Sequence, residues 1–302
     1  MIENKNIVKG GHQKMFAIFE KYAKDYNFLK NASFTLYDSV INSNTNTIKT
    51  TMWETTKLKV NDVFNLNKHK VIFVPSESLK KIYIQSGITR PIEVFDPFID
   101  DIYTYRPHID KNVLVFGLGF NQNPTVSRKN EIQTINYFLE IFADVNDVEL
   151  WIKTDQILNI KKDQKLKFFY DVFTEDQMLD WYSNIDVFIT LSKGEGVGMF
   201  NLESMAVGRP LIANPFLTVQ EYLNNENGFP LDYDLEDPKD LFFYGCGQWA
   251  ISKKQSVVNV LKNLYTNKDI LKQKGILAAK TAERYKASVS VPKLINKLKL
   301  YV

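Results

Sequence analysis

Cysteine and histidine are scarce in this chain of 302 residues. Cys246 is the single cysteine, which excludes a disulfide within the chain, and the histidines are His12, His69 and His108. Because structural zinc sites are built from several cysteines and histidines, we expect none here. A chain without disulfides is typical of a reducing compartment, so these counts favour a cytoplasmic location.

Long apolar runs are missing as well. No stretch approaches the ~20 apolar residues that cross a bilayer, so we expect no membrane span. The polar first residues lack the apolar core of a secretion signal. Residues 291–302 alternate lysine with leucine and isoleucine. This pattern suits an amphipathic helix packed on the protein, which we favour, or a segment that rests peripherally on an anionic membrane.

Neither sign of charge is in large excess. Lysine and arginine number 38 against 35 aspartates and glutamates, which leaves a formal net charge of +3. This excess is too small to indicate a nucleic-acid-binding protein by itself. Hydrophobic residues make up 44% of the chain, enough to bury the cores of two domains of about 150 residues each.

Short apolar runs alternate with helical stretches along the chain. β-branched and aromatic residues on both faces of these runs indicate parallel strands covered by helices. Ser76 is expected to cap a helix that ends at Gly87. The alternation predicts an α/β fold of two doubly wound domains. We expect strands at residues 32–37, 48–53, 70–74, 91–95, 112–116, 149–153, 167–170, 186–190 and 211–213.

The most informative motif lies at residues 191–210. A strand leads into a loop with three alternate glycines, and a helix follows at once. Bare backbone N–H groups and a helix N-terminus favour a phosphate group. Glu195 in the loop and Glu203 in the helix are suited to accept hydrogen bonds from vicinal sugar hydroxyls. A glycine-rich turn with a carboxylate that matches the helix dipole is the simpler alternative, but the combined features favour a ligand site.

The motif resembles the Glu-x7-Glu motif of retaining nucleotide-sugar glycosyltransferases of family 4, which have the GT-B fold of two Rossmann-like domains facing across a cleft. Ser204 is one of a few mild departures from the usual family residues. The resemblance implies that Glu195 holds the donor sugar and that Glu203 binds the nucleotide ribose. It also implies a donor-binding loop made of Gly194, Gly196, Val197, Gly198, Met199, Phe200 and Asn201.

Basic residues in two other segments are similar to those of one branch of this family. Arg128 and Lys129, followed later by Lys153, are similar to residues that face the donor diphosphate there. A diphosphate leaving group needs about two positive charges, which a site without metal takes from lysine, arginine and a helix terminus. A solvated charge pair is the alternative for Arg128 and Lys129. Cations are unfavourable beside a helix N-terminus, which weakens that alternative.

The base and acceptor sides carry fewer matching residues. Phe173 and Thr174 lie in a segment similar to the family loop that meets the base. Residues 51–58 match the same branch at a strand end, which makes Glu54 our acceptor-side candidate; the alternative is a carboxylate at a helix start. Gly11 belongs to a glycine pair that resembles the loop after the first strand in relatives. The first domain is shorter than is usual in the family.

Two other features are weaker. Asp232 and Asp234 have the spacing by which metal-dependent glycosyltransferases of another fold hold Mn²⁺ or Mg²⁺. We interpret them as turn carboxylates in a loop and predict no metal site. His108 is expected to be solvated in the link between the domains.

The sequence therefore predicts three parts. Residues 1–107 form a reduced, acceptor-side Rossmann-like domain, 108–284 a nucleotide-sugar-binding domain, and 285–302 a helix that packs back toward the first domain. The resemblance implies a retaining, metal-independent glycosyltransferase that needs no cofactor. It moves a hexose from a nucleoside diphosphate sugar, with a UDP-sugar favoured, to an acceptor hydroxyl. The acceptor stays open among a glycan, a lipid-linked molecule and DNA, as does the oligomeric state. The catalytic candidates are Glu195, Arg128, Lys129 and Glu54.

Three rival functions stay open. A glycosyltransferase of hydroxymethylated DNA bases is compatible with the small first domain, and it would shift glucosylatable DNA in a gel. A sugar-nucleotide epimerase needs cleft carboxylates as acid and base, and it would release UDP without an acceptor product. An inactive sugar-nucleotide-binding protein is disfavoured by the intact acidic and basic pairs.

Overall fold

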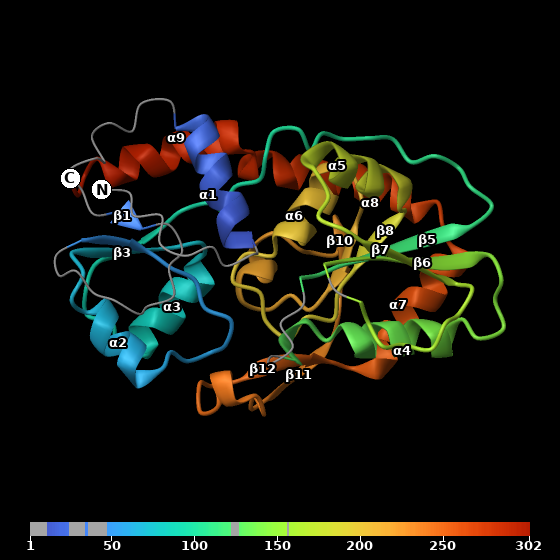
Figure 1. Ribbon diagram of the computed structural model, residues 1–302, viewed down its shortest axis with the longest axis horizontal. Coiled ribbons are helices and arrows are strands. Elements are labelled where there is room, and N and C mark those ends of the chain that lie inside the picture. Colours follow the sequence, from blue (N-terminus) through green and yellow to red (C-terminus); the bar gives the residue numbers. More distant parts are fainter. Residues whose placement is uncertain (1–10, 24–33, 36–46, 122–126, 156) are drawn as a thin grey trace.

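Parallel sheets form the framework of the chain. The computed structural model describes residues 11–23, 34–35, 47–121, 127–155 and 157–302. The first sheet has the strand order β1-β2-β3-β4 and the second β10-β9-β8-β5-β6-β7, all parallel (Figure 1). The strands are β1 (Phe34–Thr35), β2 (Ile48–Thr50), β3 (Val71–Val74), β4 (Ile92–Val94), β5 (Leu114–Gly119), β6 (Val148–Thr154), β7 (Leu166–Tyr170), β8 (Val187–Ile189), β9 (Leu211–Ala213) and β10 (Gly228–Pro230).

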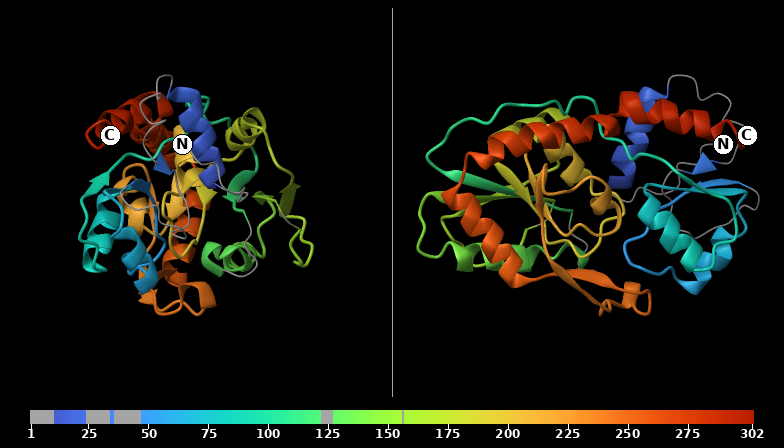
Figure 2. Two further views of the ribbon diagram at one scale, coloured as in Figure 1. Left: turned by 60° about the vertical axis from the view of Figure 1, so that its left-hand side comes forward. Right: turned by 180° about the vertical axis from the view of Figure 1, so that it is seen from behind.

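Helices cover both faces of the second sheet. Figures 1 and 2 show α4 (Glu131–Ile141) and α7 (Lys254–Thr266) on one face, with α5 (Glu175–Asn184), α6 (Met199–Ala206) and α8 (Ile270–Ala282) on the other. Residues that alternate along β5 enter two different cores: Leu114 and Phe116 pack with α4 and α7, whereas Val115 packs with the other three helices. This is the doubly wound α/β arrangement that the alternating sequence predicts.

The first sheet is also covered on both faces. α2 (Val60–Leu66) and α3 (Glu77–Gln85) pack against Ile72 and Val74 of β3. The other face carries α1 (Gly11–Tyr22) and α9 (Ala287–Leu298), which pack against Val71 and Phe73. α9 and the residues after it bind this sheet through polar contacts as well, because Tyr301 donates to Glu93 at 2.7 Å. The last helix thus lies on the first sheet, far in sequence from the strands that it contacts (Figure 2).

The strand order of the second sheet reverses its direction between β5 and β8. β5 lies between β6, the next strand along the chain, and β8, so the direction of winding reverses there. In α/β sheets of this kind, loops that leave the carboxyl ends of two such strands diverge and border the usual ligand-binding crevice. The segments after these two strands contain Arg128 and Glu195. The fold therefore predicts that the two residues meet.

Several expectations require correction. Residues 51–53 follow β2 as a loop, since the strand ends at Thr50. Asp234 lies in β11 (Tyr233–Glu236), not in a loop, because this segment pairs antiparallel with β12 (Trp249–Ser252). His108 is not solvated: its side chain is 6% exposed and its Nδ1 lies 3.7 Å from Asp186 Oδ1. The cap at Ser76 is confirmed, since its side chain accepts a hydrogen bond from the Leu79 N–H at 3.2 Å.

Within the described ranges, every helix is too short or too polar to cross a bilayer. Residues 1–10, which include the first glycine of the pair that Gly11 completes, lie outside the described residues.

Candidate active site

Four charged side chains meet where the two domains face each other. Lys129 Nζ lies 2.7 Å from Glu195 Oε1, and Arg128 Nη1 lies 3.3 Å from Glu195 Oε2. Arg128 Nε lies 2.8 Å from Glu54 Oε2, on the loop that follows β2. We call these four residues the Arg128–Glu195 cluster. All four predicted catalytic candidates belong to it, brought together from three separate segments of the chain.

Backbone contacts fix the positions of these side chains. Arg128 and Lys129 lie on a short 3-10 helix (Ser127–Lys129), and Arg128 Nη1 donates to the carbonyl of Gly194 at 2.6 Å. The indole Nε1 of Trp249 in β12 donates to the Glu54 carbonyl at 2.9 Å. The β11–β12 hairpin thereby holds the loop of the first domain against the second.

Two glycines of the motif make room for this domain contact. A Cβ on Gly194 would collide with the backbone oxygen of Glu54, and one on Gly196 would lie 2.8 Å from the sulfur of Met52. The sequence predicts that a ligand approaches these glycines closely. At these two positions the structure gives a different reason, since the group that approaches is the loop of the first domain.

Gly198 has a third role. Its φ of +79° is in the left-handed region that glycine adopts without strain, and it directly precedes α6. Among the described residues, no backbone N–H from Gly194 to Gly198 has an intramolecular hydrogen-bond acceptor. These donors and the N-terminus of α6 point to the same region and favour an anion.

The charges around the cluster shift the pKa values of its carboxyl groups in opposite directions. Burial raises the pKa of Glu195, but Lys129 and Arg128 outweigh it and lower that pKa to about 2. Burial also raises the pKa of Glu54, and there the opposing charge of Arg128 does not compensate. Glu195 is therefore firmly ionised, whereas Glu54 takes up a proton more readily than an ordinary glutamate.

The second glutamate of the motif lies in a separate ionic cluster. Glu203 on α6 is 2% exposed, and its Oε2 accepts a hydrogen bond from the Tyr182 hydroxyl at 2.9 Å. Lys14 of α1 places its Nζ 2.7 Å from Glu203 Oε1. No sequence pattern links Lys14 with Glu203. The one signal for Lys14 is that it follows Gly11, a predicted site residue, by three positions.

The other candidates of the donor loop are partly structural. Val197 is buried in the core, Met199 packs at its edge, and the ring of Phe200 stacks on that of Phe188 with centroids 6.4 Å apart. Asn201 Nδ2 donates to the Tyr222 hydroxyl at 3.2 Å. Their side chains support the loop, while its backbone N–H groups are the donors that remain available.

The remaining candidates form a third group beside β6 and β7. Lys153 Nζ donates to the Asp171 carbonyl and lies 4.8 Å from the centre of the Phe173 ring. Thr174 caps α5, since its Oγ1 accepts from the Gln177 N–H. The structure shows no direct contact of Lys153 with the Arg128–Glu195 cluster among the described residues. A hollow of about 490 Å³ opens here, lined by Trp151, Phe169, Phe173, Asp176, Gln177, Asp180 and Trp181.

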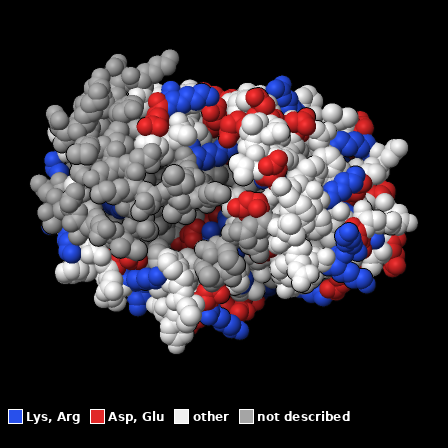
Figure 3. Space-filling model, in the orientation of Figure 1, with Lys and Arg blue, Asp and Glu red and all other residues white. Residues whose placement is uncertain are grey.

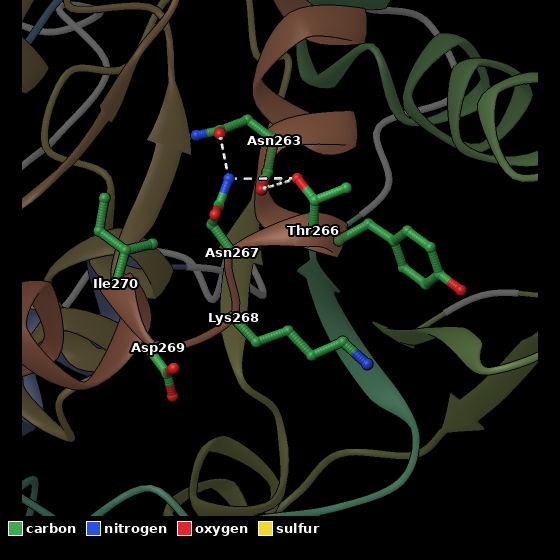
Figure 4. A pocket seen from close by; sticks show the side chains of 7 residues that line it. Asn263, Thr266, Asn267, Lys268, Asp269 and Ile270 are labelled. Atoms are coloured by element: carbon green, nitrogen blue, oxygen red, sulfur yellow. Dashed lines mark hydrogen bonds between the residues drawn. The ribbon is translucent and has the colours of Figure 1, made fainter.

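A second hollow lies at the turn between α7 and α8. Figure 4 shows its lining, where Asn267 Nδ2 donates to Asn263 Oδ1 at 2.8 Å and approaches Thr266 Oγ1. These amide and hydroxyl groups bond to one another, and no residue of the Arg128–Glu195 cluster lines the hollow. In the described ranges there is also no group of three or more His, Cys, Asp or Glu side chains placed to hold a metal ion.

Comparisons with solved structures agree with the fold described above. The chain has the GT-B fold of two facing α/β domains: it matches TarM of S. aureus with a TM-score of 0.64, at 14% identity over 93% of this chain and 57% of TarM. It also matches HepE of Anabaena, solved with UDP and glucose, with a TM-score of 0.63, at 12% identity over 94% of this chain and 76% of that one.

Sequence comparisons match a part of the chain. The family model described as glycosyl transferases group 1 matches residues 125–242. An α-1,6-glucosyltransferase from Actinobacillus pleuropneumoniae serotype 7 (strain AP76) is 26% identical over 165 residues. That alignment covers 54% of this chain and 42% of the relative. The matched family segment includes Arg128, Lys129, Glu195 and Glu203.

Proposed function

We propose that the chain is a retaining glycosyltransferase that moves a hexose from a nucleoside diphosphate sugar, with UDP as the favoured nucleotide, to an acceptor hydroxyl without a metal ion. The observation that carries the proposal is the Arg128–Glu195 cluster at the reversal point of the second sheet. Parallel α/β sheets bind ligands at this place. Three of its four residues, Arg128, Lys129 and Glu195, lie within the segment that matches the glycosyltransferase model.

The two cations of the cluster suit a diphosphate. Arg128 and Lys129 form ion pairs with Glu54 and Glu195. An incoming diphosphate competes with these carboxylates for the same cations. Because its pKa is already raised, Glu54 is the carboxyl group that most readily becomes neutral, and this leaves the cluster with a net positive charge.

The same cations serve the proposed reaction. The bond between the anomeric carbon and the diphosphate oxygen breaks, and Arg128, Lys129 and the backbone donors before α6 stabilise the negative charge of the leaving group. The acceptor hydroxyl attacks from the face that the diphosphate leaves, which retains the anomeric configuration. The leaving phosphate takes the acceptor proton. Glu195 holds the sugar hydroxyls and Glu203 the ribose.

The acceptor class remains part of the proposal. Glu54 lies on the first-domain side of the cluster, the side that we assign to the acceptor. Figure 3 shows basic and acidic side chains interspersed over the described surface in this view, and the formal net charge of the chain is only +3, whereas a DNA backbone favours a strongly basic surface. A glycan or a lipid-linked hydroxyl is therefore favoured over DNA. Cys246 is free and buried, which fits the cytoplasmic location that we propose.

A panel of UDP-, GDP- and ADP-sugars tests the proposal. Thermal shift and turnover are measured with a chelator present, and one nucleotide sugar is expected to raise the melting temperature. The rise should be lost in Glu203→Ala and weakened in Lys129→Ala. Glu140→Ala and Lys254→Ala, which break an exposed ion pair between α4 and α7, are matched controls that should keep it.

Product analysis tests the finer claims. NMR of the product should show the anomeric configuration of the donor, and a chelator should leave the rate unchanged. Inversion of configuration or full inhibition by the chelator would contradict those two claims. An unchanged melting temperature with every nucleotide sugar would overturn the proposal as a whole.

A further inference from the structure

Lys14 connects the first domain to the buried glutamate of α6. Its Nζ lies 2.7 Å from Glu203 Oε1, 3.0 Å from Glu175 Oε2 and 2.9 Å from the Tyr103 hydroxyl. The ammonium also lies 5.0 Å from the centre of the Tyr103 ring. One flexible cation from α1 thus meets carboxylates from both α5 and α6.

The carboxylate of Glu203 has little room for another partner. Oε2 accepts from Tyr182, which is fully buried, and the whole Glu203 side chain is 2% exposed. Oε1 is buried and, among the described residues, has no donor in hydrogen-bond geometry. The Lys14 ammonium meets it as a charge at 2.7 Å without that geometry. A ligand hydroxyl reaches Oε1 only if Lys14 moves away.

The Lys14 side chain can move without its helix. Met15, Ile18 and Phe19 anchor α1 in the core, and the helix end is held by Lys21, whose Nζ lies 2.8 Å from Asp100 Oδ2. The Lys14 side chain is 23% exposed, whereas Glu203 is enclosed. Glu175, 40% exposed, and the Tyr103 hydroxyl already contact the ammonium and can keep it after it leaves Glu203.

We propose that Lys14 occupies the ribose subsite of the unliganded chain, and that its ammonium shifts from Glu203 to Glu175 when the nucleotide ribose binds. The inference rests on the proposed function, because that function assigns Glu203 to the ribose. Lys14 is then a specificity-determining residue. The ribose diol must replace an ion pair, so part of its binding free energy is cancelled. Removal of the lysine charge should increase the preference for a nucleotide with both ribose hydroxyls.

Calorimetric titration with UDP and with 2′,3′-dideoxy-UDP measures this preference. It is expressed as a ratio, the dissociation constant of the dideoxy nucleotide divided by that of UDP. GDP or ADP and their dideoxy forms are the probes if the sugar-nucleotide panel selects one of them. Lys14→Met keeps the length of the side chain and removes its charge. We expect the ratio to rise about tenfold, the effect of one charge-assisted hydrogen bond that is no longer offset.

Glu175→Gln tests the second half of the inference at a more exposed position. Loss of the receiving carboxylate should hold the ammonium on Glu203, weaken UDP binding and lower the ratio, with little effect on the dideoxy nucleotide. Lys21→Met, which removes another lysine of the same helix, is the matched control and should leave the ratio unchanged.

The outcomes separate the two proposals. A ratio that falls or stays constant in Lys14→Met overturns the inference, because Lys14 then assists the ribose or is not involved. A rise in the ratio of Glu175→Gln overturns it as well. If the unmodified protein binds none of UDP, GDP and ADP, the proposed function fails first, and the inference fails with it.

Discussion

Glu195 and Glu203 belong to one motif and are both buried, yet the pKa values of their carboxyl groups shift in opposite directions. Two cations of the same domain outweigh burial at Glu195 and lower its pKa to about 2. At Glu203 burial prevails over Lys14, a single cation of the first domain, and the pKa is raised. The comparison shows that the motif fixes where the carboxylates lie, while the number and origin of their cations decide what each can bind.

The difference suits two kinds of ligand group. Glu195 stays ionised because Arg128 and Lys129 both follow β5, the strand next to β8 in the same sheet, so its charge is present before a ligand arrives. Glu203 depends on a flexible lysine of the first domain, so its environment changes when that lysine moves. In the proposed function, an anion competes for the cations at Glu195, whereas a neutral diol competes with the cation at Glu203.

The largest expected effect comes from removal of Arg128, one of the two cations that lower the pKa of Glu195 and so set it apart from Glu203. Arg128→Ala leaves Glu54 and Glu195 close together without their shared guanidinium. Breaking a buried pair in this way costs about 3–5 kcal/mol of unfolding free energy. Urea unfolding at pH 7 measures the loss. Lys253→Ala, which breaks the exposed ion pair with Asp234, is the control and should leave the stability unchanged. A similar loss in both variants would contradict the assignment.

The pH dependence of two glutamine variants tests the comparison directly. The pKa of Glu195 is lower in the folded chain than the ordinary 4.5, so its charge stabilises the fold above pH 4.5 and less as the pH falls toward 2. Glu195→Gln should therefore lose about 3 kcal/mol at pH 7, and the difference should close in acid.

Glu203→Gln should show the opposite slope. Because the pKa of Glu203 is raised, ionisation of this group costs stability as the pH rises, and the variant should improve relative to the unmodified protein. Urea unfolding between pH 3 and pH 8 measures both curves. Parallel curves would show that the two carboxyl groups have the same electrostatic environment.

Much of the Arg128–Glu195 cluster could be predicted because its members follow strands. The apolar runs that became β2, β5 and β8 are visible in the sequence, and parallel strands bring their carboxyl ends to one edge. Lys14 was missed because its contact with Glu203 depends on how α1 packs, and no local pattern encodes that. The contact of the β11–β12 hairpin with Glu54 was missed for the same reason, since Trp249 and Glu54 lie 195 positions apart.

The glycines illustrate the limit of local inference. Their spacing correctly indicates that something approaches the loop closely. Which group approaches is decided by the other domain, and at positions 194 and 196 it is the loop that carries Met52 and Glu54.

Alanine at these two glycines should give unequal effects of intermediate size. The new methyl group in Gly194→Ala meets the rigid backbone oxygen of Glu54, so the domain contact must shift, at about 1–3 kcal/mol and with a large loss of turnover. In Gly196→Ala it meets the side chain of Met52, which can rotate, so the cost should be smaller. Melting temperature and turnover of both variants are compared. Equal losses would mean that the domain contact is not what requires a glycine at 194.

The smallest loss of stability should come from removal of a hydroxyl group that donates a hydrogen bond to the glycine loop. Thr218 is 1% exposed; its Oγ1 donates to the Gly196 carbonyl at 2.6 Å and lies 3.0 Å from Ser76 Oγ of the first domain. Thr218→Val keeps the volume and leaves the carbonyl without this donor, which costs about 1 kcal/mol. A double-mutant cycle with Ser76→Ala, followed by urea unfolding, separates the link across the domains from the bond to Gly196. Additive losses would show that Thr218 stabilises the glycine loop alone, whereas a coupling energy would show that the loop and the domain contact are held by one hydroxyl.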